Sequence, residues 1–67
     1  MAIARVTKIT ALSPIGFRNA IEDGLTRASN SLRGITGLEV LSQKATVEDE
    51  RIVEFRATME VTFILED

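Results

Sequence analysis

Carboxylates, hydroxyls and a few cations are the residues that could do chemistry in this chain, because the sequence contains neither histidine nor cysteine. Their absence removes imidazole bases, thiolate nucleophiles and disulfides together. The serines therefore have no Ser–His relay to join, although a Ser–Lys pair stays open. These serines are Ser13, Ser29, Ser31 and Ser42.

Two groups of adjacent carboxylates are candidates for acid–base work: Glu22 with Asp23, and the run Glu48, Asp49 and Glu50. The first group falls on the polar side of a predicted helix and the second in a predicted turn. We expect both to be solvated charge, and we predict that the protein is not an enzyme. Sites for Mg²⁺ or Ca²⁺ stay open where carboxylates of several copies meet on a symmetry axis. The candidates by residue type are Glu48, Asp49, Glu50, Glu66 and Asp67.

The pattern of apolar residues predicts a long strand at the C-terminal end. They stand at every second position, the period of a strand with one face on a core. The set is Val53, Phe55, Ala57, Met59, Val61, Phe63 and Leu65. A second strand is predicted over Leu38–Val47, where the apolar parity changes, so we expect burial on both faces or a bulge. The charged segment 48–51 joins the two strands and predicts an antiparallel hairpin.

A helix is predicted between a first strand, Ile3–Leu12, and this hairpin. Ser13 is expected as its N-cap, Pro14 as its first helical residue and Gly34 as its stop. Gly24 lies near the apolar stripe, which predicts a close approach to a strand. The stripe itself recurs at spacings of three and four: Phe17, Ile21, Leu25, Ala28 and Leu32.

The predicted fold class is therefore α+β: strand–helix–strand–strand, with a three-stranded antiparallel sheet and one helix, as a single domain over residues 1–67. The sheet face away from the helix is expected to be mostly polar and open to copies of the chain. Its residues on the last strand are Glu54, Arg56, Thr58, Glu60 and Thr62.

Length and charge bound the possible partners. A domain of 67 residues is marginal alone, and with disulfides excluded, association is the expected source of stability. Eight basic residues are scattered among ten acidic ones, for a net charge of −2, which argues against nucleic-acid binding. No apolar stretch approaches a membrane span. Residues 1–8 lack the apolar run of a signal peptide, so a cytoplasmic location is expected.

Short segments along nearly the whole chain resemble the dodecin family, in the family's order and without a gap. They are Ser13-Pro14, Ala20-Ile21, Arg27-Ala28-Ser29, Ser31-Leu32-Arg33, Glu39-Val40, Val47-Glu48-Asp49 and Val61-x-Phe63-x-Leu65-Glu66. The resemblance implies a sheet wrapped around its helix and twelve copies assembled as a hollow shell. It also implies riboflavin or FMN stacked in antiparallel pairs between tryptophans at two-fold contacts, for storage and buffering of flavins.

The resemblance also assigns the binding positions. The stacking tryptophan falls on Gly37 and the next aromatic on Leu38, whereas the glutamine that holds the flavin edge falls on Arg56. Lys44 occupies the position of one basic residue, and Ile64 that of an arginine. These four positions, Gly37, Leu38, Lys44 and Arg56, are the predicted ligand-binding residues. The chain has no Trp or Tyr to stack on a flavin ring.

Three functions stay open from the sequence. The first is a homododecamer that binds and stores a small ligand, by resemblance a flavin, with Arg56 favouring an anionic group. The second is a structural shell with a vestigial pocket that binds ions or another anionic ligand at subunit contacts; here Arg56 pairs with Glu54, Glu60 or Glu39. The third is an enzyme acting on an anionic substrate near Arg56 and Lys44.

Overall fold

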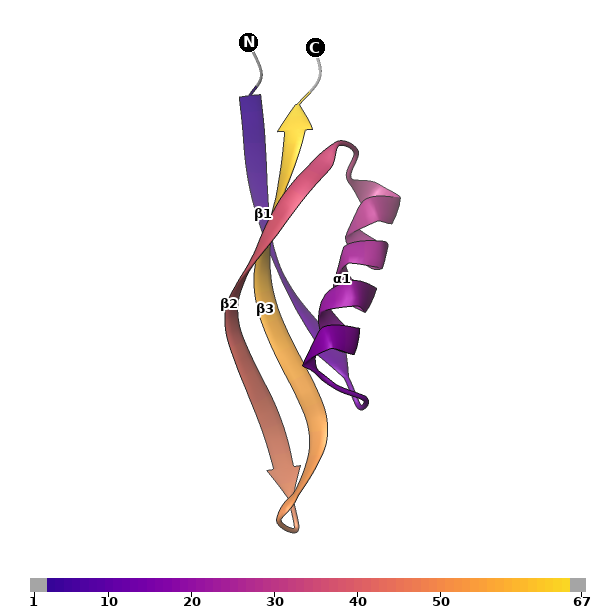
Figure 1. Cartoon of the computed structure of the whole chain (residues 1–67), viewed down its shortest axis with the longest axis vertical. Helices are drawn as coiled ribbons and strands as arrows, with labels where there is room; N and C mark the ends of the chain where they lie inside the picture. Colours follow the sequence, from indigo (N-terminus) through magenta and orange to yellow (C-terminus); the bar gives the residue numbers. More distant parts are fainter. Residues whose placement is uncertain (1–2, 66–67) are drawn as a thin grey trace.

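The computed structural model describes residues 3–65 and contains three long strands and one helix. The elements are β1 (Ile3–Ser13), α1 (Phe17–Ser31), β2 (Ile35–Glu48) and β3 (Arg51–Leu65). The strands form one antiparallel sheet in the order β1-β3-β2, with the helix on one of its faces (Figure 1). The predicted fold class and the predicted β2–β3 hairpin are confirmed.

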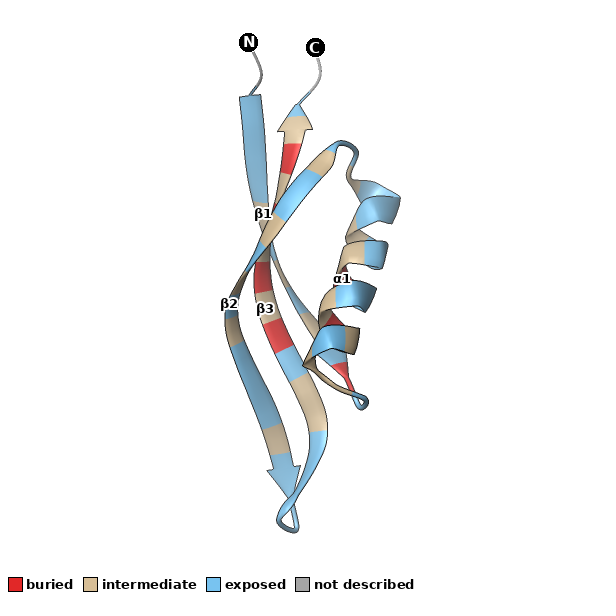
Figure 2. Cartoon of the chain, in the orientation of Figure 1, coloured by how far each residue is buried: buried red, intermediate tan, exposed pale blue. Residues whose placement is uncertain are grey.

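The buried core is small and lies between the middle of the sheet and the helix (Figure 2). Ala57, Met59, Val61 and Phe63 of β3 are buried there, as the alternation in the sequence predicts. Val53 and Leu65 share this parity but are 41% and 43% exposed, because the helix does not reach either end of β3. The apolar pattern therefore extends beyond the core that one chain can build.

The chain is less compact than a globular domain of its length. Its radius of gyration is 13.8 Å, whereas a compact domain of this length has about 11 Å. It exposes 5164 Å², whereas a compact protein of 7.4 kDa exposes about 4,200 Å². The excess, roughly 1,000 Å², is comparable to the ~800 Å² that one partner buries in a standard interface.

A bulge in β2 explains the change of parity that the sequence shows. The pairing of β2 with β3 shifts between Val40 and Ser42, so that Leu41 is the extra residue. Leu38 and Val40 before the shift, and Ala45 after it, stand opposite the apolar positions of β3. Of the two predicted alternatives, burial on both faces or a bulge, the bulge is confirmed, and it keeps the helix-facing side of β2 continuous.

The predicted start of the helix is wrong. Pro14 precedes α1, whose N-cap is Gly16 and which has no side-chain cap. Ser13 is still part of β1, where it is paired with Phe55 and buried. Its hydroxyl donates to Asn19 Oδ1 at 2.7 Å and accepts from the backbone N–H of Ile15 at 2.9 Å. Ser13 therefore fixes the turn before the helix instead of capping the helix itself.

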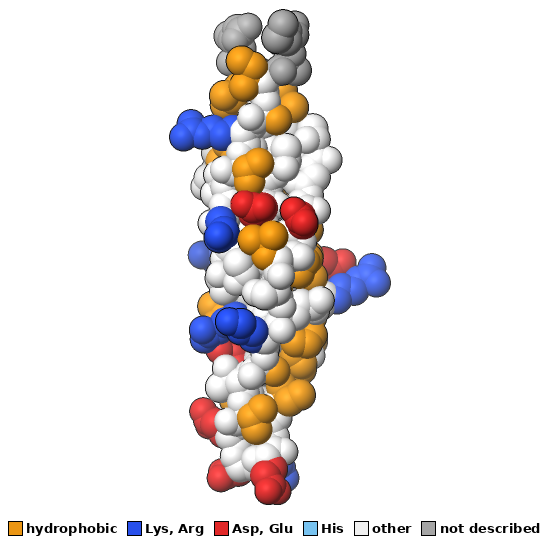
Figure 3. Space-filling view, turned by 90° about the vertical axis from the view of Figure 1, so that its left-hand side faces the viewer, with side chains coloured by type: hydrophobic (Ala, Val, Ile, Leu, Met, Phe, Trp, Pro, Cys, Tyr) orange, Lys and Arg blue, Asp and Glu red, His pale blue; other side chains and the backbone are white. Residues whose placement is uncertain are grey.

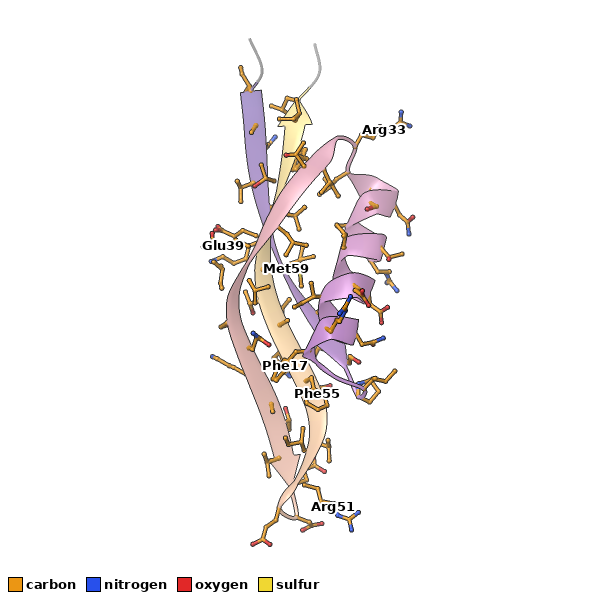
Figure 4. All side chains as sticks on the ribbon, viewed as in Figure 1. Phe17, Arg33, Glu39, Arg51, Phe55 and Met59 are labelled. Atoms are coloured by element: carbon orange, nitrogen blue, oxygen red, sulfur yellow. The ribbon has the colours of Figure 1, made fainter. Side chains whose placement is uncertain are left out.

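The helix approaches the sheet through small residues. Ala20 and Gly24 are its buried positions, and the predicted stripe of larger residues flanks them half-buried. A Cβ on Gly24 would lie 3.1 Å from Ala11 Cβ and 3.2 Å from Met59 Cε. The predicted close approach at Gly24 is confirmed. Figure 4 shows Met59 in the space between sheet and helix.

The helix ends at Ser31, and Gly34 lies beyond it in the connection to β2. Gly34 has φ 74°, and its carbonyl accepts a hydrogen bond of 3.0 Å from the backbone N–H of Ile64. A Cβ there would lie 3.2 Å from the carbonyl oxygen of Ile64. The helix stops close to the predicted glycine, and the glycine is required by both its φ and this contact.

Candidate functional site

The predicted ligand positions divide between the two faces of the sheet. Directly opposite residues of an antiparallel pair point to the same face. Gly37 is opposite Thr62 and therefore lies on the face away from the helix. Leu38 is opposite Val61 and packs half-buried against the core. Leu38 thus belongs to the other face of the same strand.

Lys44 and Arg56 are brought together, because they are direct partners in the β2–β3 ladder on the outer face of the sheet. The outer face is the face away from the helix. Arg56 Nη2 lies 3.2 Å from Glu54 Oε1, with the two side chains 49% and 37% exposed. The predicted ion pair with Glu54 is confirmed. It contributes about 0–1 kcal/mol as a surface pair and leaves donors of the guanidinium for another partner.

Gly37 and Arg56 are far apart within one subunit. The partner of Gly37, Thr62, is six residues from Arg56 along β3, which corresponds to about 20 Å. A Cβ built on Gly37 would meet nothing within 4 Å, so no side chain of the described subunit fills the space beside it. The single chain therefore does not build one pocket from the predicted positions.

The outer face carries rows of side chains that cross all three strands. Figure 3 shows this side of the molecule, where acidic and basic groups are interspersed along the sheet. The cross-strand pairs define three rows: Lys8–Glu60–Glu39, Thr10–Thr58–Ser42 and Leu12–Arg56–Lys44. In the middle row, the hydroxyls of Thr10 and Thr58 are 2.9 Å apart.

A groove of about 580 Å³ lies along the β1 edge of the sheet, between β1 and α1. Its apolar lining comes from Ile9, Ala11, Leu12, Gly24, Ala28 and Leu32, and Asp23 and Arg27 also line it. None of Gly37, Leu38, Lys44 and Arg56 is among its lining residues. Sequence reasoning missed this groove because it depends on how closely the glycine and alanine of α1 approach β1.

Two of the other residues considered for chemistry make ordinary structural contacts within the helix. Glu22 makes a surface pair with Arg18 at 3.4 Å, as its place on the polar side of the helix predicts. Ser29 donates to the backbone carbonyl of Leu25 at 2.8 Å. Within residues 3–65, no three carboxylates lie close enough together to hold a metal ion. Glu66 and Asp67 lie outside the described residues.

The two residues of the charged turn have left-handed backbone conformations. Asp49 has φ 51° and Glu50 has φ 63°, the geometry of a two-residue hairpin turn. Asp tolerates this region, whereas Glu is strained there. The three carboxylates of the turn stand at the end of the hairpin, beyond the helix-covered part of the sheet (Figure 1).

The helix of the described chain is neither long nor apolar enough to cross a membrane.

A long three-stranded sheet with one covering helix and one open face defines a small α+β subunit. The dodecin family model matches residues 3–66, and the chain belongs to the dodecin family.

Solved structures show the same relationship. A dodecin from Streptomyces davaonensis is 35% identical, with coverage of 98% of this chain and 97% of that one and a TM-score of 0.93. A dodecin from Streptomyces coelicolor is 30% identical, with coverage of 98% and 94% and a TM-score of 0.94. A calcium dodecin from Mycobacterium tuberculosis, described as having a novel calcium-binding site, is 25% identical, with coverage of 96% and 91% and a TM-score of 0.83. None of the curated proteins compared with the chain matches it.

Proposed function

We propose that this protein is a homododecameric shell that binds and stores a small ligand at contacts between its subunits, without turning it over. The observation that carries the proposal is the separation of the ligand positions. Gly37 and Arg56 lie on the same face about 20 Å apart. A small ligand that touches both must lie between two copies.

The charge of this face selects the ligand. Arg56 and Lys44 are adjacent cations, and Arg56 presents its guanidinium half exposed. Guanidinium and ammonium groups favour phosphate and carboxylate ligands. Because Gly37 supplies no ring, we expect FMN, which carries a phosphate, to bind more tightly than riboflavin, and both to bind without the stacking partner that the family's tryptophan provides.

Titration of the purified assembly with riboflavin and with FMN, followed by flavin fluorescence, tests the ligand. The proposal predicts saturable quenching, stronger for FMN. An Arg56→Gln variant should lose the preference for FMN. The absence of saturable binding of either flavin, and of inorganic phosphate by calorimetry, would contradict a ligand-storing role on this face.

A second function is favoured by the calcium dodecin among the related structures: a shell that binds divalent cations where several copies meet. The candidate groups are the carboxylates of the turn, Glu48, Asp49 and Glu50. Since one described chain gathers no three ligands, such a site has to combine copies. Calcium titration by calorimetry separates the two functions: saturable Ca²⁺ binding that an Asp49→Asn variant weakens supports the cation shell.

A further inference from the structure

Two like-charged pairs lie on the outer face of the sheet. Glu39 is directly opposite Glu60, and Lys44 is directly opposite Arg56. Like charges placed directly opposite each other in a sheet are destabilising. Figure 4 shows Glu39 projecting from the side of the sheet away from the helix. A lone subunit therefore carries two unfavourable pairs of opposite sign on one surface.

The described residues neutralise only one of these four charges, Arg56, which is paired with Glu54. Within residues 3–65 the ion pairs shorter than 4.0 Å are Arg18–Glu22 on the helix and Arg56–Glu54. Glu39, Glu60 and Lys44 have no partner of opposite charge within that distance, although Lys8 stands opposite Glu60 in the ladder. The remaining cost of the two pairs can be offset by charges outside the described chain.

The spacing of the pairs shows what can offset it. Thr58 stands midway between Glu60 and Arg56, and Ser42 stands opposite Thr58. Each charged pair is therefore about 7 Å from this hydroxyl row, on opposite sides of it. A two-fold axis parallel to the sheet, running across the strands level with Thr58, reverses the strand direction. It places Glu60 over Arg56 of a second copy.

The same operation acts on β2. It places Glu39 over Lys44 of the second copy, and by symmetry each contact occurs twice, as in any isologous interface. The residues level with the axis are Thr10, Thr58 and Ser42, whose short side chains let two sheets approach to the usual separation of about 10 Å. Long Arg, Lys and Glu side chains span that gap from both sides.

We propose that the outer faces of two subunits meet about this axis, with Glu39 and Glu60 of each copy paired to Lys44 and Arg56 of the other. The proposal rests on the assembly described under the proposed function and specifies one of its contacts in the ligand-free state, in which Glu39 and Glu60 hold the cations that an anionic ligand would compete for. It also gives the interface its register, because charge complementarity is lost when the sheets slide by one row. Part of the excess exposed surface of the subunit is covered at this contact.

Charge reversal at one pair of positions tests this contact. Glu60→Arg and Arg56→Glu, made separately, each place like charges across the two-fold axis. Both variants should lose the wild-type assembly in sedimentation velocity at low salt. An equimolar mixture of the two, refolded together, should recover it, because each variant then faces its complement. The double variant Glu60→Arg/Arg56→Glu in one chain should also assemble.

The matched control is the exposed Arg18–Glu22 pair of the helix. Arg18→Glu and Glu22→Arg, made separately, should assemble as the wild type does. Circular dichroism of every variant reports whether the subunit has kept its secondary structure.

The inference is overturned if both single variants at positions 56 and 60 assemble normally. It is also overturned if the double variant assembles but the mixture does not, because that result assigns the pairing to one chain. Normal assembly of the wild type in these cases leaves the proposed function standing. A monomeric wild type would contradict both the two-fold contact and the proposed function.

Discussion

Replacing Gly37 by tryptophan together with Arg56→Gln tests whether the family's ligand position is still a usable site in this chain. Gly37 lies on the open face of the sheet, and a Cβ there would meet nothing within 4 Å. The first carbon of a tryptophan side chain therefore meets no described atom there. Arg56→Gln adds an amide that both donates and accepts hydrogen bonds, which the donor-only guanidinium cannot do.

The magnitude follows from the stacking that the new rings provide. Stacking of a heterocyclic base on an aromatic side chain is worth about 1–3 kcal/mol. At about 1.4 kcal/mol for each factor of ten, riboflavin should bind the double variant about 5- to 150-fold more tightly than the wild type. Arg56→Trp should give no such gain, because position 37, on which the family's stacking ring falls, would still carry no side chain.

Fluorescence titration with riboflavin measures this directly, because a stacked tryptophan quenches the flavin. Riboflavin without its phosphate keeps the effect separate from the charge of Arg56 and Lys44. Light scattering of each variant confirms that the assembly is intact. Unchanged riboflavin affinity in an intact assembly of the double variant would refute the reasoning, because the space at Gly37 would then not belong to a ligand pocket.

The remaining predictions concern stability, measured by denaturant unfolding at fixed protein concentration. Glu50→Gly should stabilise the subunit by about 0.5–1 kcal/mol. The left-handed conformation costs a residue with a Cβ about 1–2 kcal/mol, and the greater entropy of glycine in the unfolded chain cancels part of the gain. Equal destabilisation by Glu50→Gly and by Glu48→Gly in the neighbouring strand would contradict the assigned turn. Gly24→Val should weaken the contact of helix and sheet by more than 1 kcal/mol, because its Cβ alone would already lie 3.1 Å from Ala11 Cβ; full stability of this variant would show that the approach is looser than described. Phe63→Ala should lower the free energy of unfolding by about 2–5 kcal/mol, and the variant should dissociate and unfold in one transition. Unfolding midpoints that do not rise with protein concentration would contradict this coupling.

Much of the fold could be predicted because local patterns and tertiary packing agree in this chain. The alternation along β3 predicts its buried face. The change of parity in β2 predicts either burial on both faces or a bulge, and the structure has the bulge. The start of the helix could not be predicted, because Ser13 is equally suited to a strand, a turn or a helix N-cap. In the structure it pairs with Phe55 in the sheet, and its side chain forms hydrogen bonds with the turn and with Asn19. The strand order β1-β3-β2 also depends on packing that no single segment specifies.

The site was predictable only as a set of positions. The resemblance assigns Gly37, Leu38, Lys44 and Arg56, but it does not show that Leu38 packs on the core while the other three share the outer face. The two like-charged pairs could not be read from the sequence either. Glu39 meets Glu60, and Lys44 meets Arg56, only because the bulge at Leu41 shifts the ladder by one residue between them.

The mass of the protein in dilute solution tests most directly whether the subunit completes its core against its own copies. Multi-angle light scattering at micromolar concentration should give twelve times 7.4 kDa, with no folded species of subunit mass. A particle of 7.4 kDa that keeps its circular dichroism and unfolds cooperatively would contradict the account, because the open sheet face would then need no partner.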